Sequence, residues 1–217
     1  MRYLVIISTI IFILIGFKII VFPNIQSIGW YYEIRSSYYL ILAQIKQKIS
    51  TSTSKEKIDI LIIGDSITNG QGIDDKKDTY PLILNEKNNH NIKTICQNGW
   101  TTLDGLKNID KVLSVNSDTV IIQLGGNDLA RGFSSNQVIK NIRRIVNLIQ
   151  KNNESIQIIL LLANKNLFRS VSNPNIPVID YSEIYSNQQL YFDPVSHHPN
   201  VEGHERIAEL VEAILKK

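Results

Sequence analysis

Hydrophobic positions divide the chain into an apolar amino-terminal segment and a longer part in which two patterns alternate. A continuous apolar run, as expected for a strand covered on both faces of a sheet, occurs at 58–63. Four further segments, at 92–96, 118–124, 155–162 and 176–180, are also predicted to be strands. Segments whose apolar residues have helical spacing occur at 80–89, 103–113, 135–151 and 201–217. Strands that alternate with helices predict a parallel sheet between two layers of helices, connected by right-handed crossovers.

We therefore predict an α/β fold for residues 58–217, a three-layer α/β/α sandwich with a parallel, flavodoxin-like sheet. Ligands of such sheets bind beyond the carboxyl ends of the strands. Two helices have a clear apolar face. We expect the inward residues to be Val138, Ile142, Ile145 and Ile149 in the first, and Ile207, Leu210, Val211 and Ile214 in the second.

The amino-terminal segment is apolar from Tyr3 to Phe22, with Lys18 as its one charge. Twenty residues at helical rise span about 30 Å, the thickness of a bilayer core. Arg2 also fits the basic start of a cleaved signal peptide, and a buried core helix is a third interpretation. We favour an uncleaved, single-pass transmembrane anchor over residues 1–23, because the apolar run is long and no small-residue cleavage site follows it.

Residues 24–57 are predicted to form an amphipathic helix and a polar linker between the anchor and the globular domain. Basic residues stand on both sides of the apolar segment, so the positive-inside rule does not give a single membrane orientation. Arg2 favours a cytoplasmic amino terminus. This orientation would place the globular domain outside the cytoplasm, in an extracytoplasmic or periplasmic location.

The net charge of +3 belongs to the amino-terminal part of the 217-residue chain. Residues 1–50 have five basic side chains and one acidic side chain, which leaves 18 basic and 19 acidic side chains for the rest. The globular part therefore has no excess of positive charge that would favour nucleic acid. One cysteine, Cys96, excludes an intramolecular disulfide and a cysteine-based zinc site, and we interpret it as a buried strand residue.

Polar clusters follow three of the predicted strands. They are GDSITNG at 64–70, QNGWTT at 97–102 and GGNDLARG at 125–132, and a fourth cluster, FDPVSHHPNVEGH, occupies 192–204. Taken one at a time, these are ordinary turn or capping sequences. A helix beginning near Ser66 would offer free N–H groups to an anion. Because parallel strands end at one edge of the sheet, the clusters are expected to meet there.

Together the clusters resemble the four sequence blocks of the SGNH (GDSL-type) hydrolase family, in family order over about residues 58–215. GGNDLARG is similar to the small bacterial thioesterase, lysophospholipase and arylesterase branch. The resemblance implies that Ser66 is the nucleophile, His198 the general base and Asp193 the group that orients it. It also implies an oxyanion hole formed by the Ser66 N–H, the Gly99 N–H and the Asn127 amide, and a reaction without metal or cofactor.

One departure from the family pattern concerns the base. The family spacing is Asp-x-x-His-Pro, but Val195 stands three residues before His198, and Asp193 stands five residues before it. Three arrangements remain open: Asp193 orients His198, a backbone carbonyl orients His198, or His197 is the base. We expect Asp65 to hold its loop through hydrogen bonds, and we interpret His90 and His204 as structural or exposed.

The predicted activity is that of a serine ester hydrolase that forms an acyl-enzyme with an acyl or acetyl ester. A hydroxyl needs an adjacent imidazole to become nucleophilic, and the sequence supplies both groups. The candidate substrates are a lysophospholipid, a thioester or another small ester. An O-acetyl esterase or acyltransferase acting on surface polysaccharide is an alternative. A non-catalytic, membrane-anchored binding module is a third possibility, and the displaced Asp193 is the feature that favours it.

Overall fold

The structure, a computed structural model, describes residues 57–164, 167, 175–187, 192–193 and 198–215. The chain divides into two units, residues 1–54 and 55–217, and all described residues belong to the second unit. The predicted anchor and nearly all of the predicted linker lie outside the described residues. Within the described ranges, no helix has the length and apolar character needed to cross a membrane.

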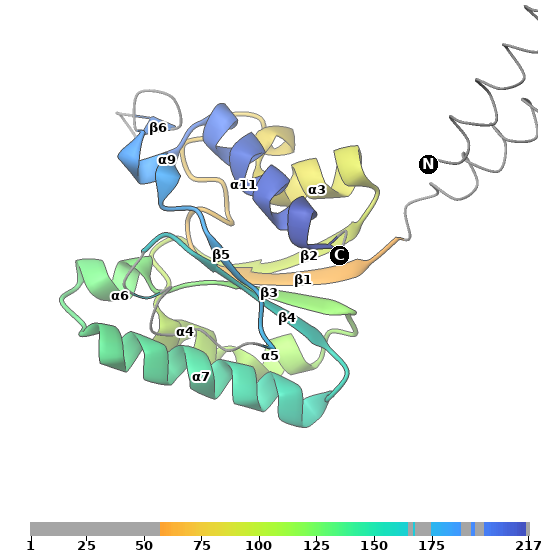
Figure 1. The fold of residues 1–217 in the computed structure, drawn as a ribbon, viewed down its shortest axis with the longest axis vertical. Helices are drawn as coiled ribbons and strands as arrows, with labels where there is room; N and C mark the ends of the chain where they lie inside the picture. Colours follow the sequence, from red (N-terminus) through yellow and green to blue (C-terminus); the bar gives the residue numbers. More distant parts are fainter. Residues whose placement is uncertain (1–56, 165–166, 168–174, 188–191, 194–197, 216–217) are drawn as a thin grey trace, which may run out of the picture. The chain divides into compact units, whose positions relative to one another are not determined.

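Five parallel strands form the central sheet in the order β2-β1-β3-β4-β5 (Figure 1). This is the flavodoxin-like order expected from the sequence. Each predicted strand is present with its ends shifted by two residues at most. The strands are β1 (Asp59–Gly64), β2 (Asn91–Cys96), β3 (Thr119–Gln123), β4 (Gln157–Leu162) and β5 (Val178–Asp180).

Helices cover both faces of the sheet, which confirms the three-layer arrangement (Figure 1). One layer contains α3 (Tyr80–Asn88) and α11 (Val201–Leu215), and the other contains α4 (Thr102–Lys107), α5 (Ile109–Leu113) and α7 (Ser135–Asn152). The short elements η2 (Lys76–Asp78), α6 (Gly126–Ala130) and α9 (Glu183–Ser186) belong to the connections. A separate antiparallel pair contains β6 (Phe192–Asp193) and β7 (His198–Pro199).

Two hydrophobic clusters hold these layers together. One lies between the sheet and α4, α5 and α7, and the other lies between the sheet and α3 and α11. All four residues predicted to line the inner face of α7 are buried, whereas Leu210 and Ile214 of α11 are only partly buried. Burying an isoleucine contributes about 1.5–3 kcal/mol, so this packing gives the strand ends a rigid support.

The helical structure predicted over 103–113 is confirmed with one interruption, because the chain forms two helices that meet at Asn108. The Asn108 side chain donates to the carbonyl of Asp104 at 3.0 Å. Its backbone leaves the helical conformation, with φ −100° and ψ 12°, so the residue ends α4 and begins α5. An asparagine amide competes with the backbone for helix hydrogen bonds, which explains the break.

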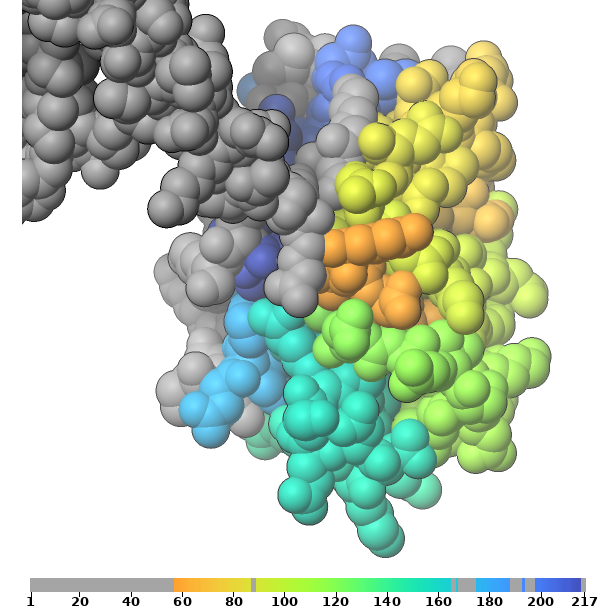
Figure 2. All heavy atoms as spheres, turned by 90° about the vertical axis from the view of Figure 1, so that its right-hand side faces the viewer, coloured from red at the N-terminus to blue at the C-terminus, as the bar shows by residue number. Residues whose placement is uncertain are grey.

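Polar contacts connect the amino ends of neighbouring strands. Figure 2 shows this side of the sheet, where the starts of β1 (orange), β3 (green) and β4 (teal) lie side by side. The Asp59 N–H donates to Asp118 at 2.9 Å, and the Thr119 hydroxyl donates to Gln157 at 3.0 Å. None of the described residues of the four sequence clusters follows the amino end of a strand, so the carboxyl edge is the one to examine for a functional site.

Candidate active site

The loops after β1, β2 and β3 are brought together by the strand order. Since β1 pairs with β2 on one side and with β3 on the other, the clusters 64–70, 97–102 and 125–132 follow three adjacent strands. The chain leaves β1 toward β2 and returns on its other side as β3, which makes this edge a topological switch point. Such a point is where open α/β sheets bind ligands.

Ser66 stands in a series of turns that follows β1, and the helix that the sequence allowed near this residue does not begin there. The N–H of Asn69 donates to the carbonyl of Asp65 at 3.0 Å, and the N–H of Gln71 donates to the carbonyl of Ser66 at 2.9 Å. Gly70 has φ +68°, a value that favours glycine, and it turns the chain away before a second helical turn can form.

Asp65 holds this turn through hydrogen bonds, as predicted. Its Oδ1 accepts from the Ile67 N–H at 3.0 Å, and its Oδ2 accepts from the Asn127 amide at 3.3 Å. Burial raises the pKa of Asp65 from 3.8 to about 6, although the Ile67 N–H opposes the shift by stabilising the carboxylate. Asp65 therefore connects the nucleophile turn with the loop after β3.

The structure places Ser66 and His198 in direct contact. The Nε2 atom of His198 lies 2.8 Å from the Oγ atom of Ser66, which is a hydrogen-bond distance. The Ser66 side chain is nearly buried, with 7% of the residue exposed, and His198 is partly buried. A hydroxyl and an imidazole at this distance and largely shielded from water can exchange a proton.

Asp193 lies opposite His198 although the spacing of the two residues departs from the family pattern. β6 and β7 pair antiparallel, and the register sets Asp193 against His198 and Phe192 against Pro199. Residues directly opposite in an antiparallel pair have Cβ atoms about 4.5–5.5 Å apart. Residues 194–197, which include the alternative base His197, lie outside the described residues.

The glycine predicted for the oxyanion hole lies in a tight turn. The N–H of Trp100 donates to the carbonyl of Gln97 at 3.2 Å, and Gly99 has φ +77°. The Asn127 Nδ2 group donates to the Trp100 carbonyl at 3.0 Å, in addition to Asp65. Asn127 thereby links the loops that follow β1, β2 and β3.

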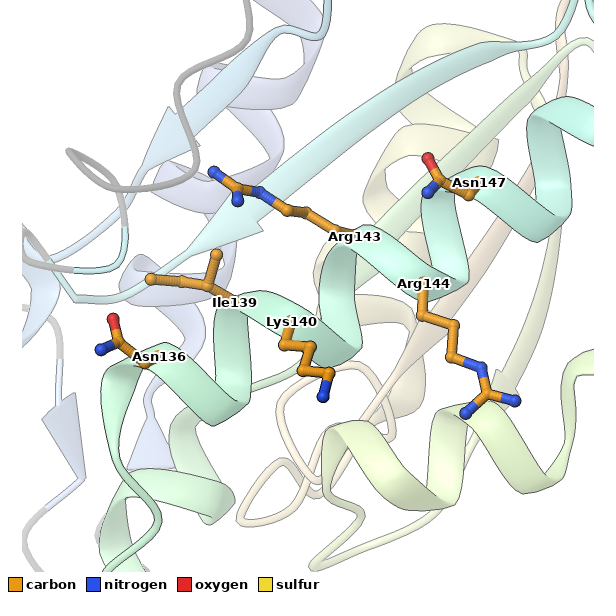
Figure 3. A pocket seen from close by; sticks show the side chains of 6 residues that line it. All are labelled: Asn136, Ile139, Lys140, Arg143, Arg144 and Asn147. Carbon is orange, nitrogen blue, oxygen red and sulfur yellow. The ribbon is translucent and has the colours of Figure 1, made fainter.

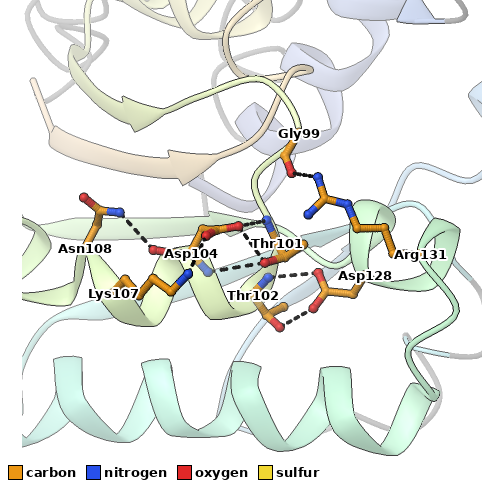
Figure 4. Close-up of polar contacts among 8 residues, drawn as sticks. All are labelled: Gly99, Thr101, Thr102, Asp104, Lys107, Asn108, Asp128 and Arg131. Atoms are coloured by element: carbon orange, nitrogen blue, oxygen red, sulfur yellow. Dashed lines mark hydrogen bonds and ion pairs between the residues drawn. The ribbon is translucent and has the colours of Figure 1, made fainter.

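Arg131 and Asp128 also tie these loops together, and sequence reasoning assigned them no role. Arg131 Nη2 donates to the Gly99 carbonyl at 2.8 Å, and the buried Asp128 accepts from the N–H and the hydroxyl of Thr102 at 2.8 and 2.5 Å (Figure 4). Both residues belong to the GGNDLARG cluster. Their place in the same cluster as Asn127, with Asp128 next to it and Arg131 four residues later, was the signal available in the sequence.

The two other histidines of the described chain are buried and structural. His204 Nδ1 accepts from the Tyr80 N–H at 3.2 Å, and the two rings stack with their centroids 6.0 Å apart. Burial lowers the pKa of His204 from 6.5 to about 4, with a smaller contribution from the positive charge of Lys76. His90 lies 3.1 Å from the carboxylate of Glu212. Neither residue contacts Ser66.

A hollow of about 480 Å³ lies along α7, away from these loops. Its lining includes three positively charged side chains, but those of Arg143 and Arg144 point in opposite directions (Figure 3). None of the lining residues belongs to the four sequence clusters. In the part of the chain that the structure describes, there is also no group of three or more His, Cys, Asp or Glu residues suited to a metal ion.

Comparison with known proteins identifies the family. Residues 62–206 match the GDSL-like lipase/acylhydrolase family, and the chain belongs to it. The resemblance expected from the four sequence blocks is thus confirmed, as is the enzyme class, carboxylic ester hydrolase.

Individual relatives agree with this assignment. The chain is 25% identical to an arylesterase from Vibrio mimicus over 150 residues, which are 67% of this chain and 73% of that protein. The psychrotrophic esterase EstA from Pseudoalteromonas sp. has a TM-score of 0.62 at 21% identity, with 72% of this chain and 96% of that chain covered. The acetyl xylan esterase AlAXEase has a TM-score of 0.58 at 20% identity, with 71% and 98% covered. These two structural likenesses show the fold.

Proposed function

We propose that the protein is a serine esterase in which Ser66 attacks an acyl or acetyl ester and His198 is the general base. The observation that carries this proposal is the distance of 2.8 Å between His198 Nε2 and Ser66 Oγ. Family membership supports the reaction class, and the contact supports the assignment of the two residues. In this assignment Asp193, opposite His198 in the β6–β7 pair, orients the imidazole.

The first half of the reaction forms an acyl-enzyme. Ser66 Oγ bonds to the carbonyl carbon of the ester while its proton passes to His198 Nε2. The carbonyl π electrons move to the oxygen, which becomes an oxyanion. When the tetrahedral intermediate collapses, the carbon–oxygen bond to the alcohol breaks, and His198 gives its proton to the departing alcohol oxygen.

The second half releases the acid and restores the enzyme. His198 takes a proton from water, and the hydroxide equivalent bonds to the acyl carbon. Collapse of the second intermediate breaks the bond to Ser66 Oγ, which recovers its proton from His198. If the hydroxyl of a sugar takes the place of water, the same steps amount to acyl transfer, which was the alternative raised by the sequence.

The oxyanion is stabilised in this proposal by the N–H groups of Ser66 and Gly99 and by the Asn127 amide. Each preorganised donor of this kind contributes about 3–4 kcal/mol to the transition state. Asn127 Nδ2 has two hydrogens, and both have acceptors, Trp100 at 3.0 Å and Asp65 at 3.3 Å. We expect the longer bond, to Asp65, to be shared with the oxyanion as its charge develops.

Two observations bear on the substrate. Similarity to an arylesterase supports a small acyl or aryl ester, within a range that also includes thioesters and lysophospholipids. The fold shared with an acetyl xylan esterase is compatible with the alternative of O-acetyl groups on a surface polysaccharide. We therefore propose short acyl esters as the first substrates to test, with a chain-length series of p-nitrophenyl esters to separate acetyl from long-acyl preference.

The decisive experiment is covalent labelling of the full chain with a fluorophosphonate, which reacts with activated serines. We expect one label per chain on Ser66, together with hydrolysis of p-nitrophenyl acetate, and the loss of both in Ser66→Ala. Ser117→Ala is the matched control, because Ser117 is a second buried serine, 8% exposed, outside the four clusters. It should label like the wild type.

Absence of labelling and of turnover in the wild type would instead support the non-catalytic binding module. Label on a serine other than Ser66 would refute the assignment of the nucleophile. Each result is read by mass spectrometry of the labelled peptide and by the rate of nitrophenolate release.

We also propose that residues 1–23 anchor the protein as a single membrane span, with the esterase domain outside the cytoplasm. The support is the apolar run from Tyr3 to Phe22 and its match to the bilayer core. The full chain should sediment with membranes and keep its amino terminus, and removal of residues 1–23 should release it. A mature protein that begins after this segment would favour the cleaved signal peptide instead.

A further inference from the structure

Gln123 is the last residue of β3 and lies directly behind the turn that carries Ser66. Its Oε1 atom accepts hydrogen bonds from the Thr68 hydroxyl at 2.8 Å and from the Asp65 N–H at 3.3 Å. We infer that Gln123 is a positioning residue that holds Ser66 at its reactive distance from His198. This inference rests on the proposed function, since it assigns a role toward the proposed nucleophile.

The hydrogen bonds around Gln123 form a chain in which each side chain donates to the next, from Tyr80 through Thr68 and Gln123 to Tyr181. The Thr68 hydroxyl has a single hydrogen and gives it to Gln123, so the 2.7 Å contact between the oxygens of Tyr80 and Thr68 is a donation from Tyr80. On its other side, Gln123 Nε2 donates to the Tyr181 oxygen at 3.1 Å. The four side chains form a polar network that we call the Gln123 network: Tyr80, Thr68, Gln123 and Tyr181.

The Gln123 network is shielded from solvent, and all four of its residues are buried. Burial also raises the pKa of both tyrosines, which keeps their hydroxyl groups neutral and able to donate. In a dry interior, a donor that loses its acceptor cannot turn to water instead. The network is therefore costly to disrupt and well suited to fix the position of a turn.

Glutamine meets the demands of this position because its amide accepts on one side and donates on the other. A carboxylate would only accept, and a methionine of similar shape would do neither. Gly64 lets the turn come this close, because a Cβ at Gly64 would overlap the Thr68 hydroxyl and lie 3.0 Å from Gln123 Oε1. The contact between Gln123 and the turn thus depends on the backbone at Gly64 as well as on the Gln123 side chain.

Ser66 lies between the two groups that Gln123 holds, the N–H of Asp65 and the hydroxyl of Thr68. A release of either group lets the turn move, and the Ser66 oxygen moves with it. A displacement of about 1 Å at a reacting group costs on the order of 100-fold in rate. The effect is expected in the chemical step more than in substrate binding, because Gln123 lies behind the turn.

The test is Gln123→Met in the full chain, with the rate and the end-point of fluorophosphonate labelling at Ser66 measured separately. We expect the labelling rate and kcat for p-nitrophenyl acetate to fall about 10- to 100-fold. KM should change by less than about threefold, and the end-point should stay at one label per folded chain. A purely structural role would lower the end-point instead, because unfolded molecules do not label.

Two controls match this variant. Gln157→Met makes the same substitution where a glutamine accepts from Thr119 at the opposite edge of the sheet, and it should keep the wild-type rate. Val120→Ala removes two buried methyl groups from the same strand, β3, and lowers stability at a residue outside the Gln123 network. If it slows labelling per folded chain as much as Gln123→Met does, stability explains the loss and the inference is wrong.

A second pair of variants decides the matter if Gln123→Met does not fold. Thr68→Val removes the hydroxyl at nearly constant shape and should lower the labelling rate about tenfold, whereas Thr68→Ser keeps the hydroxyl and should stay within about threefold of the wild type. Equal rates in the two variants would overturn the inference. A wild type that does not label at all would refute the proposed function itself, which is a distinct outcome.

Discussion

His198 Nε2 lies 2.8 Å from Ser66 Oγ, although 132 positions separate the two residues in the chain. Ser66 follows β1, and His198 begins β7, just before the last helix packs on the sheet. The contact therefore depends on the whole domain being folded. Local stability of either loop alone could not produce it.

The assignment of the general base predicts a large loss in His198→Gln. Without the imidazole the Ser66 hydroxyl keeps its proton, so kcat for p-nitrophenyl acetate should fall by about 10³- to 10⁴-fold or more. His197→Gln is the matched variant and should stay close to the wild type. The opposite result, with activity lost only in His197→Gln, would make His197 the base.

Asp193→Asn distinguishes the two ways in which His198 can be oriented. If the carboxylate faces the imidazole, it stabilises the imidazolium that forms during the reaction, and kcat should fall about 10- to 1000-fold. Asp118→Asn, at the opposite edge of the sheet, is the control. A change of less than twofold in Asp193→Asn would show that a backbone carbonyl orients the base.

Asn127→Ala tests the oxyanion hole. Loss of the amide donor should lower kcat by about 10²- to 10³-fold with little change in KM, because the bond strengthens only as the oxyanion forms. Asn141→Ala removes an amide that donates to the Thr102 hydroxyl at 2.9 Å, away from Ser66, and should cost little. Equal effects of the two variants on kcat would argue against a role for Asn127 in the transition state.

Asp65 should make folding stability fall as pH rises from about 4 to about 6. In this range the folded protein binds more protons than the unfolded chain, because burial raises the pKa of Asp65 from 3.8 to about 6. The change corresponds to about 3 kcal/mol of unfolding free energy. In Asp65→Asn this contribution is absent, so the variant should gain stability relative to the wild type as pH rises. The measurement is urea denaturation across this pH range. If the prediction is wrong, the difference in unfolding free energy between Asp65→Asn and the wild type will stay constant.

His204 should have the opposite effect on the pH dependence of folding stability. Its pKa is lowered from 6.5 to about 4 in the folded protein, so the unfolded chain binds more protons between these values. Stability contributed by the neutral ring is complete above pH 6.5 and is lost as pH falls toward 4, again by about 3 kcal/mol.

In His204→Gln only the Asp65 contribution remains, so the free energy of unfolding should rise on acidification relative to the wild type. The measurement is the same series of urea denaturations, with the wild type and Asp65→Asn alongside. Since Asp65 and His204 oppose each other over this range, their contributions nearly cancel in the wild type and appear only in the single variants. Parallel curves for His204→Gln and the wild type would contradict the assignment.

The sequence alone determined the architecture, because burial on both faces of a sheet demands apolar runs that are visible without coordinates. The five strands, the inner face of α7 and the four sequence blocks could all be predicted in this way. Proximity of the loops after β1, β2 and β3 also followed, since parallel strands end at a shared edge. The break at Asn108 could not be predicted from spacing, because it depends on one side-chain hydrogen bond.

Only the tertiary structure decided how the residues of the site face one another. The register of β6 and β7 sets Asp193 opposite His198, which the number of intervening residues had left open. The role inferred for Gln123 was likewise invisible, since a glutamine at the end of an apolar strand has no distinctive pattern. Apolar periodicity reports which residues are buried, whereas hydrogen-bond partners far apart in the chain are set by strand order, register and side-chain orientation.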